Sequence, residues 1–123
     1  KDTITAAATY KQLETAPQSE VAAEAIYFRA HQLYQQGMFE ESNVLIDKIA
    51  QLGGSTGIWN VKALLLLAKN YFKLQDDFQA VFVLESIIEN FDSYPELIKE
   101  SKSLLELYKD SSLSTNPSAN EIE

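Results

Sequence analysis

Residues 27–50 and 65–88 decide the fold, and they read YFRAHQLYQQGMFEESNVLIDKIA and LLLAKNYFKLQDDFQAVFVLESII. The two stretches align without a gap, so each residue of the first meets the residue 38 positions later in the second (27 meets 65). Small residues and large apolar residues recur at matching positions of the two copies. The pairs are Ala30 and Ala68, Leu33 and Tyr71, Tyr34 and Phe72, Ser42 and Ala80, Ile46 and Leu84, and Ile49 and Ile87. An internal repeat of this length predicts stacked helical hairpins.

Each copy holds two apolar stripes with helical spacing, separated by a short polar turn. The turn falls at Gly37 in the first copy and at Asp76 and Asp77 in the second. Glycine can take the left-handed conformation that ends a helix, and Asp76 followed by Gln79 has the capping-box spacing that starts one. Because the apolar residues follow the 3.6-residue period and do not alternate over a long run, strands are not expected. Each copy is therefore predicted to be a helix, a tight turn and a second helix.

The flanking segments complete the predicted organisation. It consists of a remnant second helix of a preceding repeat over 1–17, repeats over about 20–52 and 57–91, a capping helix over 94–109 and a disordered tail over 111–123. The remnant helix indicates that the chain is a fragment that begins in mid-repeat. Ser93 and Glu96 form a second capping-box pair, ahead of the last helix. The tail is expected to be disordered because it has no apolar period.

At these residues the chain resembles the tetratricopeptide repeat family, whose unit has small residues where its two helices cross and bulky ones around them. The matching positions in the first copy are Ala30, Leu33, Gly37, Phe39 and Ser42. The second copy supplies Ala68, Tyr71 and Ala80, but it has Gln75 where the glycine belongs, and its aromatic residue moves one place to Phe78. The resemblance implies an all-α, tetratricopeptide-like α-solenoid of antiparallel hairpins. Residues 58–88 also resemble repeats of large Bacteroidetes tetratricopeptide proteins, which implies a bacterial source and points to the cell envelope or periplasm.

Composition excludes several kinds of partner. Acidic residues outnumber basic ones 18 to 10, giving a formal net charge of -8, whereas nucleic-acid binding needs a basic surface. The chain has no cysteine, so disulfides and thiolate metal sites are excluded. Its longest apolar run, residues 63–68, is far shorter than the roughly 20 residues that span a bilayer. We therefore expect no nucleic-acid partner and no membrane insertion by this fragment.

The sequence offers no catalytic constellation. His31 is the only histidine, and a general base needs a positioned partner and a pocket. The adjacent acids Glu40 and Glu41 stand at a predicted helix start, where carboxylates favourably meet the helix dipole, and no loop has EF-hand spacing. The glycines between the two copies lie between helices, so they are expected to form a connector rather than a phosphate-binding loop. The chain is predicted to be no enzyme and to use no cofactor or metal.

The family resemblance implies a concave groove lined by the first helix of each hairpin. The positions that carry over to this groove are Glu24, Tyr27, Phe28, His31, Tyr34 and Gln35 in the first copy and Lys62, Leu65, Leu66, Lys69, Phe72 and Lys73 in the second. Their apolar and aromatic members are expected to lie outside the stripe that packs each hairpin. An exposed apolar groove edged by charge suits a peptide or helix ligand. Coverage of the same face by missing repeats or by the terminal helix is the alternative.

The function predicted from the resemblance is a non-catalytic scaffold that binds a protein or peptide partner in this groove. Two alternatives are kept: architectural spacer repeats within a longer tetratricopeptide protein, and a regulatory domain of a larger enzyme. The exposed ends of the repeat array would also permit self-association. Two local features stay open as well. Lys62, Lys69 and Lys73 form either a solvated face or a basic strip for an acidic peptide, and Trp59 is either a core anchor between repeats or a recognition aromatic.

Overall fold

The structure is a computed structural model that describes residues 19–52 and 56–115. Its helices are α2 (Ser19–Gln35), α3 (Phe39–Ala50), α4 (Ile58–Lys73), α5 (Asp77–Asn90) and α6 (Pro95–Thr115), and these residue ranges contain no strand. The all-α class predicted from the sequence is therefore confirmed. The predicted remnant helix over 1–17 and the glycines at 53 and 54 lie outside the described residues.

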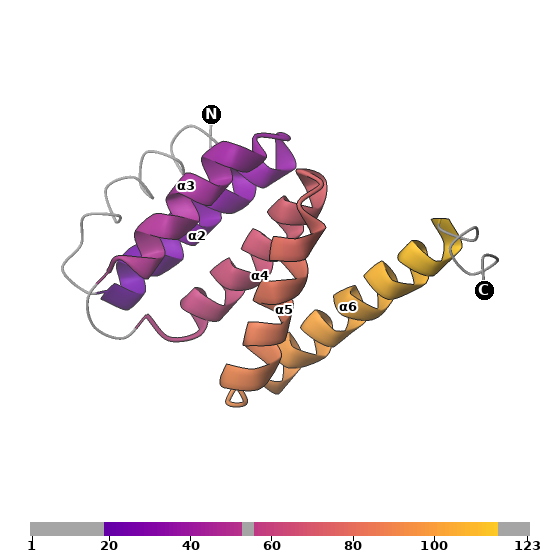
Figure 1. Cartoon of the computed structure of the whole chain (residues 1–123). Coiled ribbons are helices and arrows are strands. Elements are labelled where there is room, and N and C mark those ends of the chain that lie inside the picture. The colour runs from indigo at the N-terminus through magenta and orange to yellow at the C-terminus, as the bar shows by residue number, and fades with distance from the viewer. Residues whose placement is uncertain (1–18, 53–55, 116–123) are drawn as a thin grey trace.

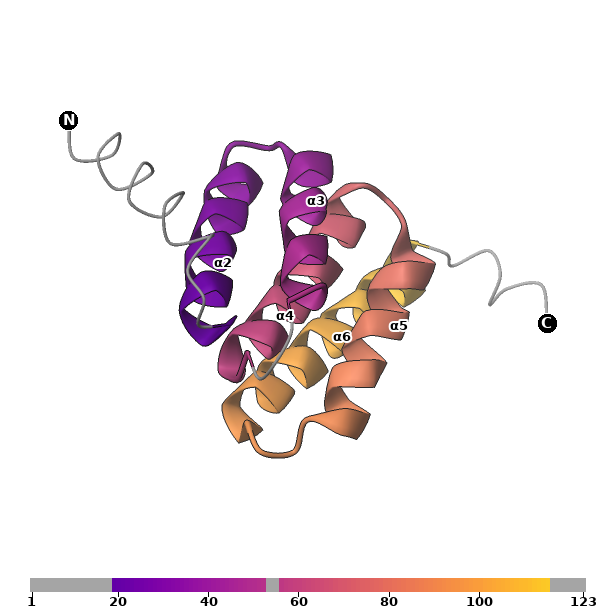
Figure 2. The same cartoon turned by 90° about the vertical axis from the view of Figure 1, so that its left-hand side faces the viewer.

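The helices form a regular chain of hairpins. Each helix packs against the next one in sequence, and α4 additionally contacts both α2 and α6 (Figures 1 and 2). Helices α2 and α3 form the first hairpin, α4 and α5 form the second, and α6 follows and packs against both helices of the second hairpin. This order of contacts places α2, α4 and α6 side by side, so their side chains can share one face.

The two hairpin turns have the same backbone geometry. In the first, Gly37 has φ 79° and the N–H of Met38 donates to the carbonyl oxygen of Leu33 at 2.8 Å. In the second, Gln75 has φ 64°, and the N–H of Asp76 donates to the carbonyl oxygen of Tyr71, also at 2.8 Å. A positive φ with a bond back to the last helical turn is the Schellman arrangement that ends a helix. The repeat thus imposes the left-handed position on Gln75, although glutamine is poorly suited to it.

We expect Gln75→Gly to raise the free energy of unfolding by about 0.5 to 1 kcal/mol. The left-handed conformation costs a residue with a Cβ about 1 to 2 kcal/mol, and part of this gain is offset by the greater backbone freedom of glycine in the unfolded chain. Urea denaturation of the two proteins measures the difference. Gln75→Ala is the control, because it keeps the Cβ and should change stability by less than about 0.5 kcal/mol. A glycine variant no more stable than the alanine variant would contradict the expectation.

The start of α5 agrees with its predicted cap, whereas the start of α6 does not. The N–H of Gln79 donates to the Asp76 carboxylate at 3.3 Å, so Asp76 is the N-cap. Helix α6 begins at Pro95, and the carbonyl of Tyr94 accepts from the N–H groups of the first turn. The predicted cap at Ser93 is therefore one residue too early. Proline suits the first helical position because the N–H it lacks has no partner there.

Helix α6 is also longer than the predicted capping helix over 94–109. It continues to Thr115, into the segment for which the sequence predicts disorder. The reason is local: residues 111–115 contain no glycine or proline, and the first helix-breaking residue beyond them is Pro117. A proline disfavours the helical conformation in the residue before it, which here is Asn116. The absence of an apolar period was therefore a poor guide to where this helix ends.

Among the residues that the structure describes, two buried clusters form the core, and α4 contributes to both. The first consists of Ala23, Ile26, Ala30, Leu45, Ile46, Ile49, Ala63 and Leu66, and the second of Val61, Leu65, Ala68, Val83, Leu84 and Ile87. Ala30, Ala68 and Ala80 are completely buried, which allows paired helices to approach closely. Helix α4 packs against neighbours on both sides, so most of its circumference is apolar.

A buried polar network joins α2, α3 and α4. The hydroxyl of Ser42 donates to the carbonyl oxygen of Ala30 at 2.8 Å. The side-chain amide of Asn70 donates to Ser42 Oγ and to Asn43 Oδ1, both at 2.9 Å. Ser42 and Asn70 are fully buried. This network connects the first hairpin to the second by hydrogen bonds, in addition to their apolar contact.

Candidate functional site

An aromatic ladder runs along α2 on the predicted groove face. Tyr27, His31 and Tyr34 are spaced by four and three residues, and each neighbouring pair of rings has its centroids 6.0 Å apart. The ladder continues at both ends, to Trp59 at 5.7 Å from Tyr27 and to Phe39 at 5.8 Å from Tyr34. The helical spacing of the sequence thus brings three predicted groove residues together. They offer ring faces and edges, which are suited to binding rather than to chemistry.

Trp59 lies at the joint between the two hairpins. Its ring is 5.6 Å from that of Phe28 and 5.7 Å from that of Tyr27, and it packs against the first core cluster. The ammonium group of Lys62 sits 4.7 Å from the centroid of the same ring. The core-anchor interpretation of Trp59 therefore fits its contacts. The half-buried ring of Trp59 also borders the groove, because the ammonium group of the groove residue Lys62 lies over one of its faces.

Helix α4 is the only helix among the described residues that carries basic side chains and no acidic ones: its charged residues are Lys62, Lys69 and Lys73. Lys69 forms an ion pair with Glu100 of α6 at 3.1 Å, with the two side chains 32% and 46% exposed. An exposed pair of this kind contributes about 0 to 1 kcal/mol, so a ligand carboxylate could displace Glu100 at little cost. Lys73 is exposed.

The first helices of the two hairpins, α2 and α4, together with α6 border a hollow of about 190 Å³. Its lining residues are Tyr27 from α2, Lys62, Leu65, Leu66 and Lys69 from α4, and Leu97 and Glu100 from α6. Every lining residue from α2 and α4 is a predicted groove residue. Leu97 and Glu100 were not predicted to line the groove. Both lie on α6, which follows the second hairpin, and this place in the repeat order could have identified them. The leucines at its floor are almost fully buried, so its exposed lining is more polar than apolar, with two lysines and one carboxylate at the edge.

The position of Tyr27 beside this hollow raises the pKa of its hydroxyl group. Burial raises the pKa of its hydroxyl above the ordinary tyrosine value, and the nearby carboxylate of Glu100 raises the pKa further. The hydroxyl therefore stays protonated at neutral pH and remains a hydrogen-bond donor. A group so far from titrating at neutral pH is poorly suited to be a general base there, in line with a binding role.

The structure corrects the predicted exposure of several groove residues. Leu65 and Leu66 are 4% and 2% exposed and belong to the two core clusters, because α4 is packed on both sides. Tyr27 and Tyr34 pack against the first cluster and Phe72 against the second, so these rings are not outside the packing surface. Phe72 also stacks on Tyr108 of α6, with centroids 5.6 Å apart.

The remaining predicted groove positions divide between the sides and the ends of the helices. Glu24 and Phe28 are half-buried on α2, while Gln35 and Lys73 are exposed at the C-terminal ends of α2 and α4. The predicted groove face is therefore only partly accessible. Its accessible centre consists of the aromatic ladder on α2, the lysines of α4 and the neighbouring part of α6.

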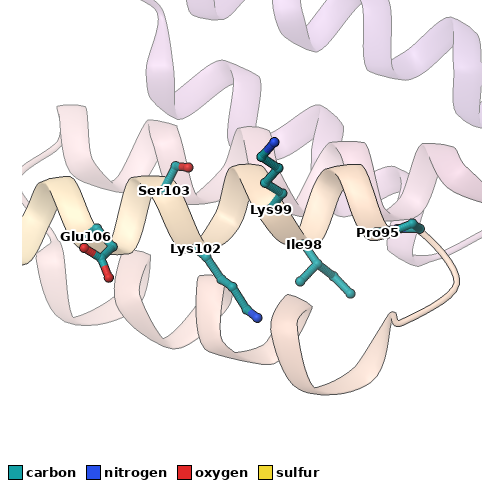
Figure 3. A pocket seen from close by; sticks show the side chains of 6 residues that line it. All are labelled: Pro95, Ile98, Lys99, Lys102, Ser103 and Glu106. Carbon is teal, nitrogen blue, oxygen red and sulfur yellow. The ribbon is translucent and has the colours of Figure 1, made fainter.

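A larger but more open hollow, of about 450 Å³, lies along α6 alone. Pro95, Ile98, Lys99, Lys102, Ser103 and Glu106 line it, and Figure 3 shows Ile98 and Lys102 projecting from one side of the helix and Lys99 from the other. All of its lining residues come from one helix, so it is an open depression rather than an enclosed site. The polar side chains of this hollow do not point toward a common centre, as those of a small-molecule site do.

Within the described part of the chain, no group of His, Asp and Glu side chains is placed to hold a metal ion. Among the helices described, none combines the length and the apolar character needed to cross a membrane. The comparisons with protein-family models, with curated proteins and with solved structures gave no significant match. The likeness to tetratricopeptide repeats therefore rests on the repeated residues.

Proposed function

We propose that this chain folds as a tetratricopeptide-type α-solenoid and acts as a non-catalytic scaffold that binds a protein or peptide segment. Three features support the solenoid assignment: the residue pattern repeats at a fixed offset, both turns have the same Schellman geometry, and the first helices are consecutive neighbours. Each hairpin then adds one first helix to a shared face, as in helical repeat proteins that bind ligands on their concave side.

The observation that carries the binding role is the convergence of three helices on one hollow. Tyr27 supplies an aromatic wall and a hydroxyl donor, Leu65 and Leu66 supply an apolar floor, and Lys62 and Lys69 stand at the rim. A ligand segment would place a carboxylate near the lysines and an apolar side chain against the ring of Tyr27. The ladder from Tyr27 to Tyr34 extends the apolar surface along α2.

The test is selection of random twelve-residue peptides displayed on phage against the whole chain, followed by measurement of affinity for the enriched peptides. We expect Lys62→Glu to weaken their binding at least about tenfold, because it places a negative charge at the rim of the hollow. Lys48→Glu is the matched control, since it makes the same charge change on the exposed surface of α3 and should leave affinity unchanged. Failure to enrich any peptide, or equal binding by both variants, would count against the groove.

An architectural spacer is the second candidate, and two contacts favour it. Glu100 forms an ion pair with Lys69, and the ring of Tyr108 lies against the ring of Phe72. Helix α6 therefore already contacts part of the face that a ligand would use. In that case the first helices bind only each other, and the groove is the inner surface of a longer array. The peptide selection separates the two functions, because a spacer would yield no ligand that depends on Lys62.

A further inference from the structure

Helix α5 carries two aromatic rings that the fold does not use. Phe78 is 83% exposed and Phe82 is 61% exposed, and they stand one helical turn apart. The buried residues of the same helix, Ala80, Val83, Leu84 and Ile87, lie toward its other side. Single exposed apolar residues are ordinary on protein surfaces, but two neighbouring phenylalanines form an apolar patch that favours a contact.

The two rings belong to a longer stripe with a consistent charge. Phe78, Phe82, Glu85 and Glu89 follow one another at intervals of four, three and four residues, so they share one side of the helix over about 16 Å. All four are exposed, and neither glutamate forms an ion pair within the described residues. Residues 74–94 contain five acidic residues and no lysine, arginine or histidine. The α5 stripe, as we call these four residues, is therefore aromatic at one end and acidic at the other.

The repeat itself does not require these aromatic residues. The equivalent positions on α3, 38 residues earlier, are Glu40, Val44, Asp47 and Gln51. All four are exposed too, and Val44 is 61% exposed, as is Phe82. Since α3 forms an equivalent hairpin without an aromatic pair, the phenylalanines of α5 serve something other than hairpin formation.

We propose that the α5 stripe is a docking site for a basic amphipathic helix of a protein partner. Apolar side chains opposite the two rings would bury them, and lysine or arginine beside those side chains would pair with the two carboxylates. A helix with an apolar stripe flanked by basic residues supplies both at the spacing that α5 presents. The site faces away from the core side of α5 and shares no residue with the groove, so it is independent of the proposed groove function.

Two other occupants fit the stripe less well. An anionic lipid surface would be repelled by Glu85, Glu89 and the acidic residues around them. A second copy of this chain carries a formal net charge of -8, so its approach to an acidic stripe is opposed by the overall charge. The charge of the stripe therefore selects a basic protein segment.

The experiment uses a fluorescent helical peptide of about fourteen residues, made of leucine and lysine with leucine on one face, titrated with the chain at low salt. A second peptide has glutamate at every lysine position. We expect the lysine peptide to bind and the glutamate peptide not to bind. The double variant Phe78→Ser/Phe82→Ser should weaken binding at least about tenfold. Glu85→Gln/Glu89→Gln should also weaken it and reduce its salt dependence. Val44→Ser, the matched control on α3, should bind like the unchanged chain.

Several results would overturn the proposal. Undiminished binding by the double serine variant would show that the peptide binds elsewhere, and binding of the glutamate peptide would remove the charge argument. Light scattering that shows a dimer lost only in the serine variant would make the stripe a self-association surface. Binding to phosphatidylcholine vesicles that requires both rings would make it a lipid contact. Lys62→Glu should leave lysine-peptide binding intact, so failure at the stripe is distinguishable from failure at the groove.

Discussion

Asn70→Asp is expected to lower the free energy of unfolding by more than about 3 kcal/mol at neutral pH. The Asn70 side chain is fully buried, and its amide group donates hydrogen bonds to Ser42 Oγ and Asn43 Oδ1. A carboxylate has the same shape but can only accept, so it would face two oxygens. The one hydroxyl proton nearby, on Ser42, is already donated to Ala30. The substitution therefore buries an unpaired charge, which is among the costliest single changes.

The loss should be measured by urea denaturation across a range of pH. Burial would raise the pKa of the introduced carboxyl above its unfolded value, so its penalty is absent below the unfolded pKa and grows as pH rises through the interval between the two values. The deficit of Asn70→Asp should therefore shrink in acid. Asn60→Asp is the matched control on the same helix: it lies in the first turn of α4, where an acidic residue is favourable. A deficit below about 1 kcal/mol for Asn70→Asp would show that position 70 is hydrated.

The hairpins could be predicted from the sequence because their determinants are local. Gly37 and the Asp76 cap each act within one turn of the chain, and the fixed offset of the repeat transfers the geometry of the first turn to Gln75. The all-α class follows from the same periodicity. The family resemblance also placed Tyr27, Lys62 and Lys69 on the face where the hollow is found.

The accessible surface of α4 could not be predicted from its sequence. Four consecutive leucines at positions 64 to 67 point in every direction around the helix, so periodicity cannot separate a groove side from a core side. Leu65 and Leu66 are buried because α4 has neighbours on both sides. The polar network was missed for a related reason. Asn70 contacts Ser42 and Asn43 across 28 and 27 residues of sequence, and nothing local signals that pairing.

Leu84→Ala is expected to lower the free energy of unfolding by about 2 to 5 kcal/mol. Leu84 is completely buried in the second core cluster, where it packs with Leu65 of α4 and Ile87 of its own helix. Truncation removes its transfer free energy and leaves a cavity that close neighbours can fill only in part. The helical propensity of alanine is higher than that of leucine, but that gain is only a few tenths of a kcal/mol. Thermal and urea denaturation should both show the loss.

Phe82→Ala, two residues earlier on the same helix, is the decisive comparison. It removes a larger side chain than Leu84→Ala does, yet we expect a change within about 0.5 kcal/mol, because the Phe82 ring is 61% exposed. If the two substitutions cost the same, the ring is part of the core and the docking site on α5 is wrong. If only Leu84→Ala is costly, α5 has a core side that holds the fold together and an outer side that contributes nothing to stability. An outer side that is dispensable for folding leaves Phe78 and Phe82 available for the proposed contact with a protein partner.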